Sequence, residues 1–218
     1  MVDKYKIAYK GGFAEITEKK SRFLANVLPV ESEEQANAFL ESTRKQYWDA
    51  KHNCFAYVIG ENHEIKRYSD DGEPSGTAGK PMLDVILGQD IHNVMVVITR
   101  YFGGTLLGTG GLVKAYSKTT AMGLSHSTIV DKCLGKKLYI KTDYNCIGKL
   151  QYIAREMELT ILKIEYSDIV EAFILVPGEL KVAFKKKLVE ATSAKVIIEE
   201  LEDQYYAKSL DNEEVILF

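Results

Sequence analysis

The spacing of apolar residues predicts alternating strands and helices in the first part of the chain. Residues 21–28 fit a strand. Ser32 precedes Gln35 by three positions in a capping box, in which the Ser hydroxyl and the Gln amide satisfy free backbone donors and start a helix at 33–48. The elements predicted next are a hairpin of strands 53–59 and 65–69, a short helix from Pro81 to about Leu87, a wholly apolar and therefore buried strand at 94–99, a glycine-rich loop at 103–111 and a helix at about 112–124.

The pattern restarts after Gly135–Lys137, where we place the domain boundary. The order that follows is β-α-β-β-α-β, the ferredoxin-like arrangement. Its elements are a strand at 138–142, a helix with Ile147, Leu150, Ala154 and Met157 on one face, strands at 159–166 and 169–176, a helix marked by Leu180, Ala183, Phe184 and Leu188, and a strand at 195–201. We therefore predict an α+β chain of two domains, 1–135 and 136–218.

Composition agrees with two globular domains in a reducing compartment. The chain has 218 residues, of which 46% are hydrophobic and 27% charged, enough apolar material for two cores. No apolar run reaches the roughly 18–20 residues that span a bilayer, and the first ten residues do not fit a signal peptide. Three scattered cysteines, Cys54, Cys133 and Cys146, predict reduced thiols. We expect a cytoplasmic protein without a membrane partner.

Charge is distributed unevenly along the chain. The net charge is −3, which by itself argues against a nucleic-acid binder. Residues 1–140 hold 18 Lys and Arg against 16 Asp and Glu, whereas residues 141–218 hold 10 against 15. Any attraction to phosphate must therefore come from the first part, and locally.

A loop at 67–81 carries three carboxylates in four residues, Asp70, Asp71 and Glu73. One interpretation is a solvated turn that caps the helix at Pro81. The other is a hard-cation site or an acid/base pair, because carboxylate oxygens suit Mg²⁺ or Ca²⁺. The alternating spacing of an EF-hand is missing, and Pro74 and Pro81 replace required residues of a P-loop. We expect no tight structural metal here, and at most weak Mg²⁺ binding.

A second loop carries five glycines between a buried strand and a helix. Free amides at a helix N-terminus attract anions, and Arg100 and Lys114 add positive charge at the two ends of this segment. The segment predicts that phosphate, sulfate or an RNA backbone binds between Gly103 and Gly111, with Tyr101 or Phe102 exposed for stacking. The alternatives are that the glycines only permit tight turns, and that Arg100 pairs with a carboxylate of the acidic loop and braces the two loops.

The four histidines, His52, His63, His92 and His126, are far apart in sequence, and no pair has metal-binding spacing. His52 lies near the start of a predicted strand, from which it could reach the acidic loop. A lone strand histidine is more often structural than functional.

Four segments of the first domain together resemble the YigZ/IMPACT family. They occur in family order and span most of residues 20–116. The segments are Lys20–Phe23, His52–Tyr57, Asp70–Gly79, and Thr99–Gly104 continuing through Leu107–Leu112.

The resemblance implies both folds and a role in translation. The first domain is expected to be like the second domain of small-subunit ribosomal protein five, and the second like the ferredoxin-like domains of elongation factor G. Eukaryotic IMPACT proteins restrain a starvation-sensing translation kinase by competing for its activator. They carry an additional N-terminal domain for partner binding, which we do not expect here. No settled enzymatic activity is implied for the bacterial members, and a peptidase activity finds no metal-ligand set in the sequence.

The leading hypothesis is a cytosolic binding protein that acts on translation through RNA, the ribosome or a translation factor, without a cofactor or metal. The rival is an enzyme of phosphate or acyl (hydrolase) chemistry that uses the acidic loop 70–73, with His52 as base. A hydrogen bond between His52 and a carboxylate in a cleft would favour the enzyme. The candidate binding residues are Arg22, His52, Arg67, Asp70, Asp71, Glu73, Thr77, Arg100, Gly103, Gly104, Gly108, Gly110, Gly111 and Lys114.

Overall fold

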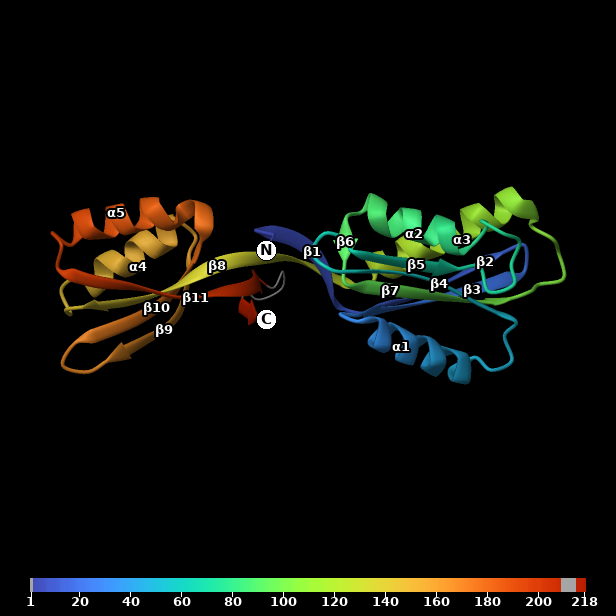
Figure 1. Ribbon diagram of the computed structural model, residues 1–218, viewed down its shortest axis with the longest axis horizontal. Helices are drawn as coiled ribbons and strands as arrows, with labels where there is room; N and C mark the ends of the chain where they lie inside the picture. The colour runs from blue at the N-terminus through green and yellow to red at the C-terminus, as the bar shows by residue number, and fades with distance from the viewer. Residues whose placement is uncertain (1, 209–214) are drawn as a thin grey trace. The chain divides into compact units, whose positions relative to one another are not determined.

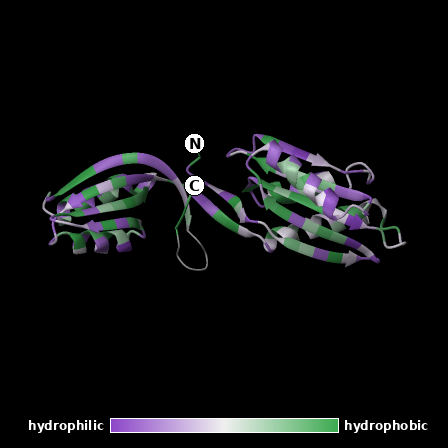
Figure 2. Cartoon of the chain, turned by 90° about the horizontal axis from the view of Figure 1, so that it is seen from below, coloured by the Kyte–Doolittle hydropathy of each residue, from purple (hydrophilic) through white to green (hydrophobic). Residues whose placement is uncertain are grey.

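The computed structural model describes residues 2–208 and 215–218 (Figure 1). The chain divides into two compact units, Met1–Asp131 and Lys132–Phe218. Each unit has its own hydrophobic core, and both are mixtures of helices and strands, so the predicted α+β class is confirmed. Hydrophobic and hydrophilic positions alternate along the elements of both units (Figure 2), as expected for strands and helices with one buried face. None of the helices in the described ranges is long and apolar enough to cross a membrane.

The first unit is built on a five-stranded antiparallel sheet with helices on both faces. The strands, in spatial order, are β2 (Phe13–Glu18), β3 (Ser21–Pro29), β7 (Val94–Tyr101), β4 (His52–Ile59) and β5 (Ile65–Ser69). Helix α1 (Glu33–Gln46) covers one face, and α2 (Gly79–Gly88) and α3 (Gly108–Ser125) cover the other.

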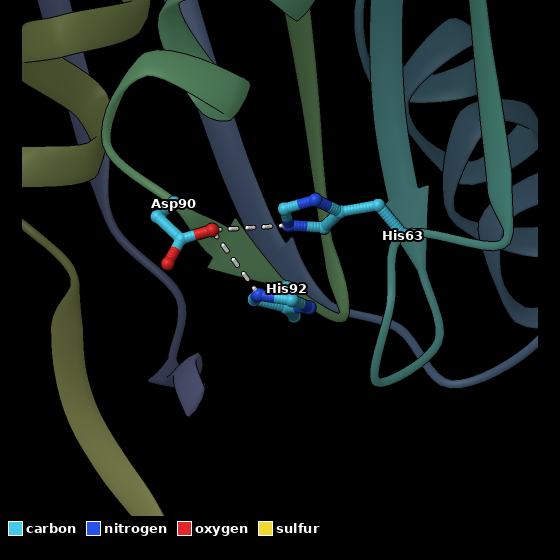
Figure 3. Close-up of side chains that lie close together, drawn as sticks. All are labelled: His63, Asp90 and His92. Carbon is cyan, nitrogen blue, oxygen red and sulfur yellow. Dashed lines mark ion pairs between the residues drawn. The ribbon is translucent and has the colours of Figure 1, made fainter. Parts of the chain in front are cut away.

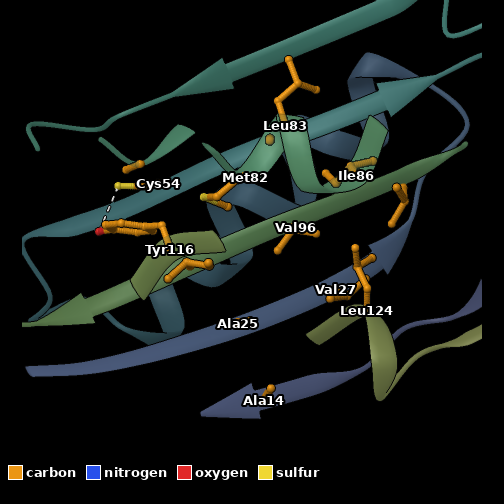
Figure 4. Close-up of a cluster of buried hydrophobic side chains, with 14 of the residues drawn as sticks. Ala14, Ala25, Val27, Cys54, Met82, Leu83, Ile86, Val96, Tyr116 and Leu124 are labelled. Atoms are coloured by element: carbon orange, nitrogen blue, oxygen red, sulfur yellow. Dashed lines mark hydrogen bonds between the residues drawn. The ribbon is translucent and has the colours of Figure 1, made fainter. Parts of the chain in front are cut away.

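The central strand β7 is apolar from Val94 to Ile98, where both of its faces are buried. Val96 and Ile98 pack into the cluster formed with α2 and α3, which Figure 4 shows, while Met95 and Val97 pack into the cluster formed with α1. Successive side chains of a strand point to opposite faces, so a strand in the middle layer needs apolar residues at every position. The prediction of a buried central strand is confirmed.

Helix α1 begins as its capping box predicts. The Ser32 hydroxyl accepts a hydrogen bond from the backbone N–H of Gln35 at 3.3 Å, and the Gln35 side-chain oxygen accepts one from the backbone N–H of Glu31 at 2.8 Å. Two backbone donors are thereby satisfied at the helix N-terminus.

A pair of short parallel strands completes the first unit. Strand β1 (Lys4–Lys10) pairs with β6 (Ile91–His92), with Lys6 opposite Ile91. Neither strand was predicted from the sequence.

The second unit has the predicted ferredoxin-like order. Strands β8 (Thr128–Thr142), β9 (Thr160–Tyr166), β10 (Val170–Pro177) and β11 (Val196–Lys208) lie in the antiparallel order β11-β8-β10-β9. Helices α4 (Ile147–Glu156) and α5 (Lys181–Ala191) pack on one face around Leu150 and Phe184. A 3-10 turn (Gly178–Leu180) precedes α5, and β12 (Val215–Leu217) pairs with the end of β11.

Two element boundaries differ from the predicted ones in ways that matter for the site. Helix α3 begins at Gly108 rather than at about 112, so Gly108, Gly110 and Gly111 form its first turn instead of a loop. Strand β8 begins at Thr128 and runs through residues 135–137, where a domain boundary was predicted. Ladder pairing on both sides holds these residues in a strand. The boundary at 135 stays a prediction.

Candidate functional site

Strand register brings three of the four family-like segments together at one end of the first sheet. Phe23 of β3 and His52 of β4 both lie opposite Arg100 of β7, one on each side. The acidic loop after β5 folds against this row, and Glu73 within it reaches Arg100. Segments that are distant in sequence therefore meet because β7 is the central strand between β3 and β4.

Arg100 and Glu73 form the buried centre of the cluster. The Arg100 Nη1 donates to Glu73 Oε1 at 2.6 Å and to Oε2 at 2.9 Å, and only 7% and 3% of the two side chains are exposed. The guanidinium also lies 5.3 Å from the ring centre of Phe23, within cation–π range. This is the predicted alternative in which Arg100 pairs with a carboxylate and braces the two loops. Arg100 is buried, so it is not the exposed cation that the predicted anion site at 103–111 would need.

Two buried donors lie next to this ion pair. The Tyr116 hydroxyl donates to Glu73 Oε1 at 2.9 Å, and the Cys54 thiol lies 3.3 Å from the Tyr116 hydroxyl (Figure 4). Burial raises the pKa of Cys54 to about 12 and also raises the pKa of Tyr116. Both groups therefore stay protonated at neutral pH, where Tyr116 serves Glu73 as a donor and Cys54 is not a reactive thiolate.

Asp70 organises the acidic loop through the backbone. Its Oδ1 accepts hydrogen bonds from the N–H groups of Ala78 and Gly79, at 3.0 and 2.9 Å, and its Oδ2 accepts one from Gly76 at 2.8 Å. These donors include the first free amides of α2, which the Asp70 carboxylate thereby caps.

Asp71, Thr77 and the neighbouring His52 also have partners. Asp71 Oδ2 accepts from the backbone N–H of Asn53 at 2.6 Å, and Oδ1 accepts from Arg44 at 3.2 Å. The Thr77 hydroxyl donates to a backbone carbonyl of the loop at 2.6 Å. His52 Nδ1 lies 2.8 Å from the backbone carbonyl oxygen of Asp71, not from a carboxylate. The arrangement that would favour an acid/base enzyme is therefore not the one found.

Two predicted arginines lie apart from the buried cluster. Arg22 is half-exposed and pairs with Glu15 of β2 at 2.7 Å, and its guanidinium lies 5.7 Å from the ring centre of Tyr101. Arg67 of β5 lies 3.5 Å from Glu33 at the start of α1, on the opposite face of the sheet from α2 and α3. Arg67 is therefore not brought together with the glycine segment.

The glycines after β7 fit two different structural needs. A Cβ at Gly103 would lie 2.0 Å from the backbone carbon of Lys20, so only glycine permits this close packing against the β2–β3 turn. Gly104 and Gly108 have positive φ angles of 80° and 73°. Gly108, Gly110 and Gly111 form an exposed or half-exposed first turn of α3, which begins without a side-chain cap.

A small basic pocket adjoins this first turn. Its volume is about 150 Å³ and three lysines, Lys19, Lys114 and Lys118, contribute to its wall. The other lining residues are Ile16, Glu18, Leu107, Gly111 and Ala115. Of the predicted site residues, Gly111 and Lys114 line it. The spacing of four between Lys114 and Lys118 on α3 is the sequence signal that was available and not used.

Comparisons with known proteins decide the family. The Impact N-terminal domain matches residues 19–124, and a domain of unknown function (DUF1949) matches residues 140–195. The IMPACT family member YvyE of Bacillus subtilis is 40% identical over 212 residues, which cover 97% of this chain and 98% of that protein. This chain belongs to the IMPACT family. The sequence resemblance is thereby confirmed.

Other members of the IMPACT family match over similar lengths. The Escherichia coli member YigZ is 35% identical over 79% of this chain and 85% of its own. A crystal structure of a hypothetical protein shares 31% identity at a TM-score of 0.59, over 93% of this chain and 99% of that one. The two-domain translational regulator Yih1 shares 29% identity over 51% of this chain and 47% of its own, at a TM-score of 0.35, too low to support a conclusion.

One cluster in this IMPACT-family chain was missed by the sequence interpretation. His63, Asp90 and His92 lie together (Figure 3), although His63 is distant in sequence from the other two. Burial lowers the pKa of His63, and the neighbouring His92 lowers it further. No spacing rule links these residues, because the turn after β4 and the connection from α2 to β6 meet only in the folded unit.

Proposed function

We propose that this chain is a cytosolic binding protein that regulates translation, and that its basic pocket on α3 holds phosphate groups of RNA. Membership of the IMPACT family supports the role in translation, as the resemblance described above implies. The observation that carries RNA binding is the pocket itself, in which Lys19, Lys114 and Lys118 line one hollow beside the first turn of α3.

The lysines of the pocket are available to an anion. Within the described ranges, the ion pairs found include none with Lys19, Lys114 or Lys118. Lys114 and Lys118 are one turn apart on the same helix, an arrangement that costs about 0.2–0.5 kcal/mol by like-charge repulsion. A bound phosphate would relieve this repulsion. Among the described residues that line the pocket, Glu18 is the one carboxylate.

Two further features of the segment between β7 and α3 suit a nucleic acid. The first turn of α3 presents backbone N–H groups at the positive end of the helix dipole, close to glycines that let an anion approach. Phe102, which follows β7, is 56% exposed and offers a face on which a base can stack. Basic groups would position the backbone, and the aromatic ring would contact a base without selecting its sequence.

Salt-dependent RNA binding tests the proposal. A fluorescent single-stranded RNA is titrated with the wild type and with Lys114→Gln/Lys118→Gln at several salt concentrations. Each lost phosphate contact lowers the slope of log K against log salt by about 0.7, so the double variant should lose about 1.4. Lys45→Gln/Lys186→Gln removes the same charge from exposed positions elsewhere and should leave the slope unchanged. An unchanged slope and affinity in a folded Lys114/Lys118 variant would refute RNA binding at this pocket.

A further inference from the structure

Three side chains of types that can bind metal ions converge in the first unit, outside the basic pocket. Asp90 Oδ1 lies 3.4 Å from His92 Nε2 and 3.7 Å from His63 Nε2. One ligand atom from each residue lies within 4.8 Å of the other two (Figure 3). The two imidazoles come from different segments, the turn between β4 and β5 and the short strand β6.

The orientation of His92 is fixed by a hydrogen bond on its far side. Its Nδ1 lies 3.0 Å from the backbone carbonyl oxygen of Gly60. A carbonyl can only accept, so the proton of the neutral ring is on Nδ1 and the Nε2 lone pair points toward Asp90. Metal-ligating histidines are held in the same manner, by donating their second ring nitrogen to a carbonyl or carboxylate.

His63 contributes a buried nitrogen that lacks a hydrogen bond. Its side chain is 15% exposed, and Nε2 makes no hydrogen bond to any residue that the structure describes. Leaving such an atom buried and unpaired costs about 1–3 kcal/mol. A cation beside Asp90 would give this nitrogen the partner that the protein does not provide.

The donor set and distances suit zinc. Imidazole nitrogen favours zinc over Mg²⁺, which takes oxygen ligands. Zinc bonds to nitrogen and oxygen are about 2.0–2.2 Å, so two ligands of one tetrahedral ion lie about 3.3–3.5 Å apart, close to the two separations at Asp90. We infer that His63, Asp90 and His92 bind one Zn²⁺ ion, with water in the fourth position.

The surroundings leave room for the ion and for one adjustment of the ligands. Asp90 has 72% of its side chain exposed, so the open position faces solvent. The two imidazoles stack with ring centres 3.7 Å apart and an interplanar angle of 24°. Coordination requires one ring to rotate about its Cβ–Cγ bond until both lone pairs meet, and His63 is the free one because Gly60 holds His92. The bound ion would join the β4–β5 turn to the α2–β6 connection.

Zinc titration of chelator-treated protein tests the inference. Competition with a chromophoric chelator should give one site per wild-type chain. His63→Asn and Asp90→Asn each remove a ligand, and asparagine tolerates the positive φ of 54° found at both positions. Loss of an outer-shell partner typically costs 10–100-fold in metal affinity, so each variant should bind more than about 100-fold more weakly.

Matched controls and a spectroscopic measurement complete the test. His126→Asn and Asp84→Asn alter one exposed histidine and one exposed aspartate elsewhere, and should retain wild-type affinity. Co²⁺ in place of Zn²⁺ should give visible bands without the ultraviolet charge-transfer bands of a thiolate ligand. Unchanged zinc affinity in folded His63→Asn and Asp90→Asn variants, or a thiolate spectrum, would overturn the site.

Discussion

The guanidinium of Arg100 lies against the carboxylate of Glu73, with Nη1 2.6 Å from Oε1 and both side chains withdrawn from solvent. The pair joins the central strand to the acidic loop, and Ser21 of β3 lies 3.4 Å from the second guanidinium nitrogen. An ion pair at the surface contributes little to stability. Loss of one partner of a buried pair is strongly destabilising, because it leaves an uncompensated buried charge.

Arg100→Met is expected to lower the free energy of unfolding by about 3–5 kcal/mol, because Glu73 is left buried without its counter-ion. Urea unfolding measures this loss. Arg22→Met, at an exposed pair with Glu15, should cost less than about 1 kcal/mol. The double variant Arg100→Met/Glu73→Met should be more stable than Arg100→Met alone, since it removes both charges. A single Arg100 variant as stable as the Arg22 variant would contradict the bracing role.

The elements that the sequence predicted well are those whose pattern is complete within the segment. The cap at Ser32 and the apolar run of β7 each depend on a few neighbouring residues. Strand β1 was missed because lysines interrupt its apolar residues, and the two-residue strand β6 has no pattern of its own and is defined only by its pairing with β1.

The candidate site was predictable in its parts and not in its pairings. The sequence left open which carboxylate Arg100 would contact. In the structure Asp70 and Asp71 accept hydrogen bonds from backbone N–H groups, and Glu73 is the carboxylate that pairs with Arg100. Lys19 joins Lys114 only through the packing of the β2–β3 turn against α3. These pairings are set by the tertiary structure, so residue type and spacing alone do not predict them.

The β2–β3 turn allows a test of whether its strained backbone conformation places Lys19 for RNA binding. Lys19 and Lys20 are its two central residues, with φ angles of 44° and 67°, where Asn and Gly are preferred. Strained non-glycine residues cost about 1–3 kcal/mol each. Lys19→Asn/Lys20→Gly should therefore raise the free energy of unfolding by at least about 1 kcal/mol and weaken RNA binding, because Lys19 leaves the pocket wall. A stabilised variant with wild-type RNA affinity would exclude Lys19 from the binding surface.

Alkaline pH should destabilise the first unit through Cys54. Burial raises the pKa of this thiol from 9.0 to about 12. The folded state thus holds the Cys54 proton more tightly than the unfolded state does. The protonated thiol therefore contributes fully to stability below pH 9, and this contribution is lost as pH rises from 9 through 12. Cys54→Ala should flatten the dependence of unfolding free energy on pH in that window, even though the cavity lowers stability at neutral pH. Equal slopes in the two proteins would be inconsistent with a protonated buried thiol.

The first unit is expected to fold alone. Its two hydrophobic clusters are made entirely by residues before the predicted boundary at 135. A chain of residues 1–135 should therefore unfold cooperatively in urea, and limited proteolysis of the whole protein should leave a stable fragment of about this size. A non-cooperative transition, or cleavage confined to residues 67–114 or 145–190, would count against two independent domains.

The backbone contacts of Asp70 also bear on the order in which the first unit assembles. Its carboxylate reaches amides six to nine residues further along the chain, whereas Arg100 and Glu73 are 27 positions apart and Ser21 and Arg100 are 79 apart. Closing a short segment costs less entropy than closing a long one. The acidic loop can therefore form early in folding, through the contacts of Asp70. The ion pair between Glu73 and Arg100 then forms when β7 joins the sheet.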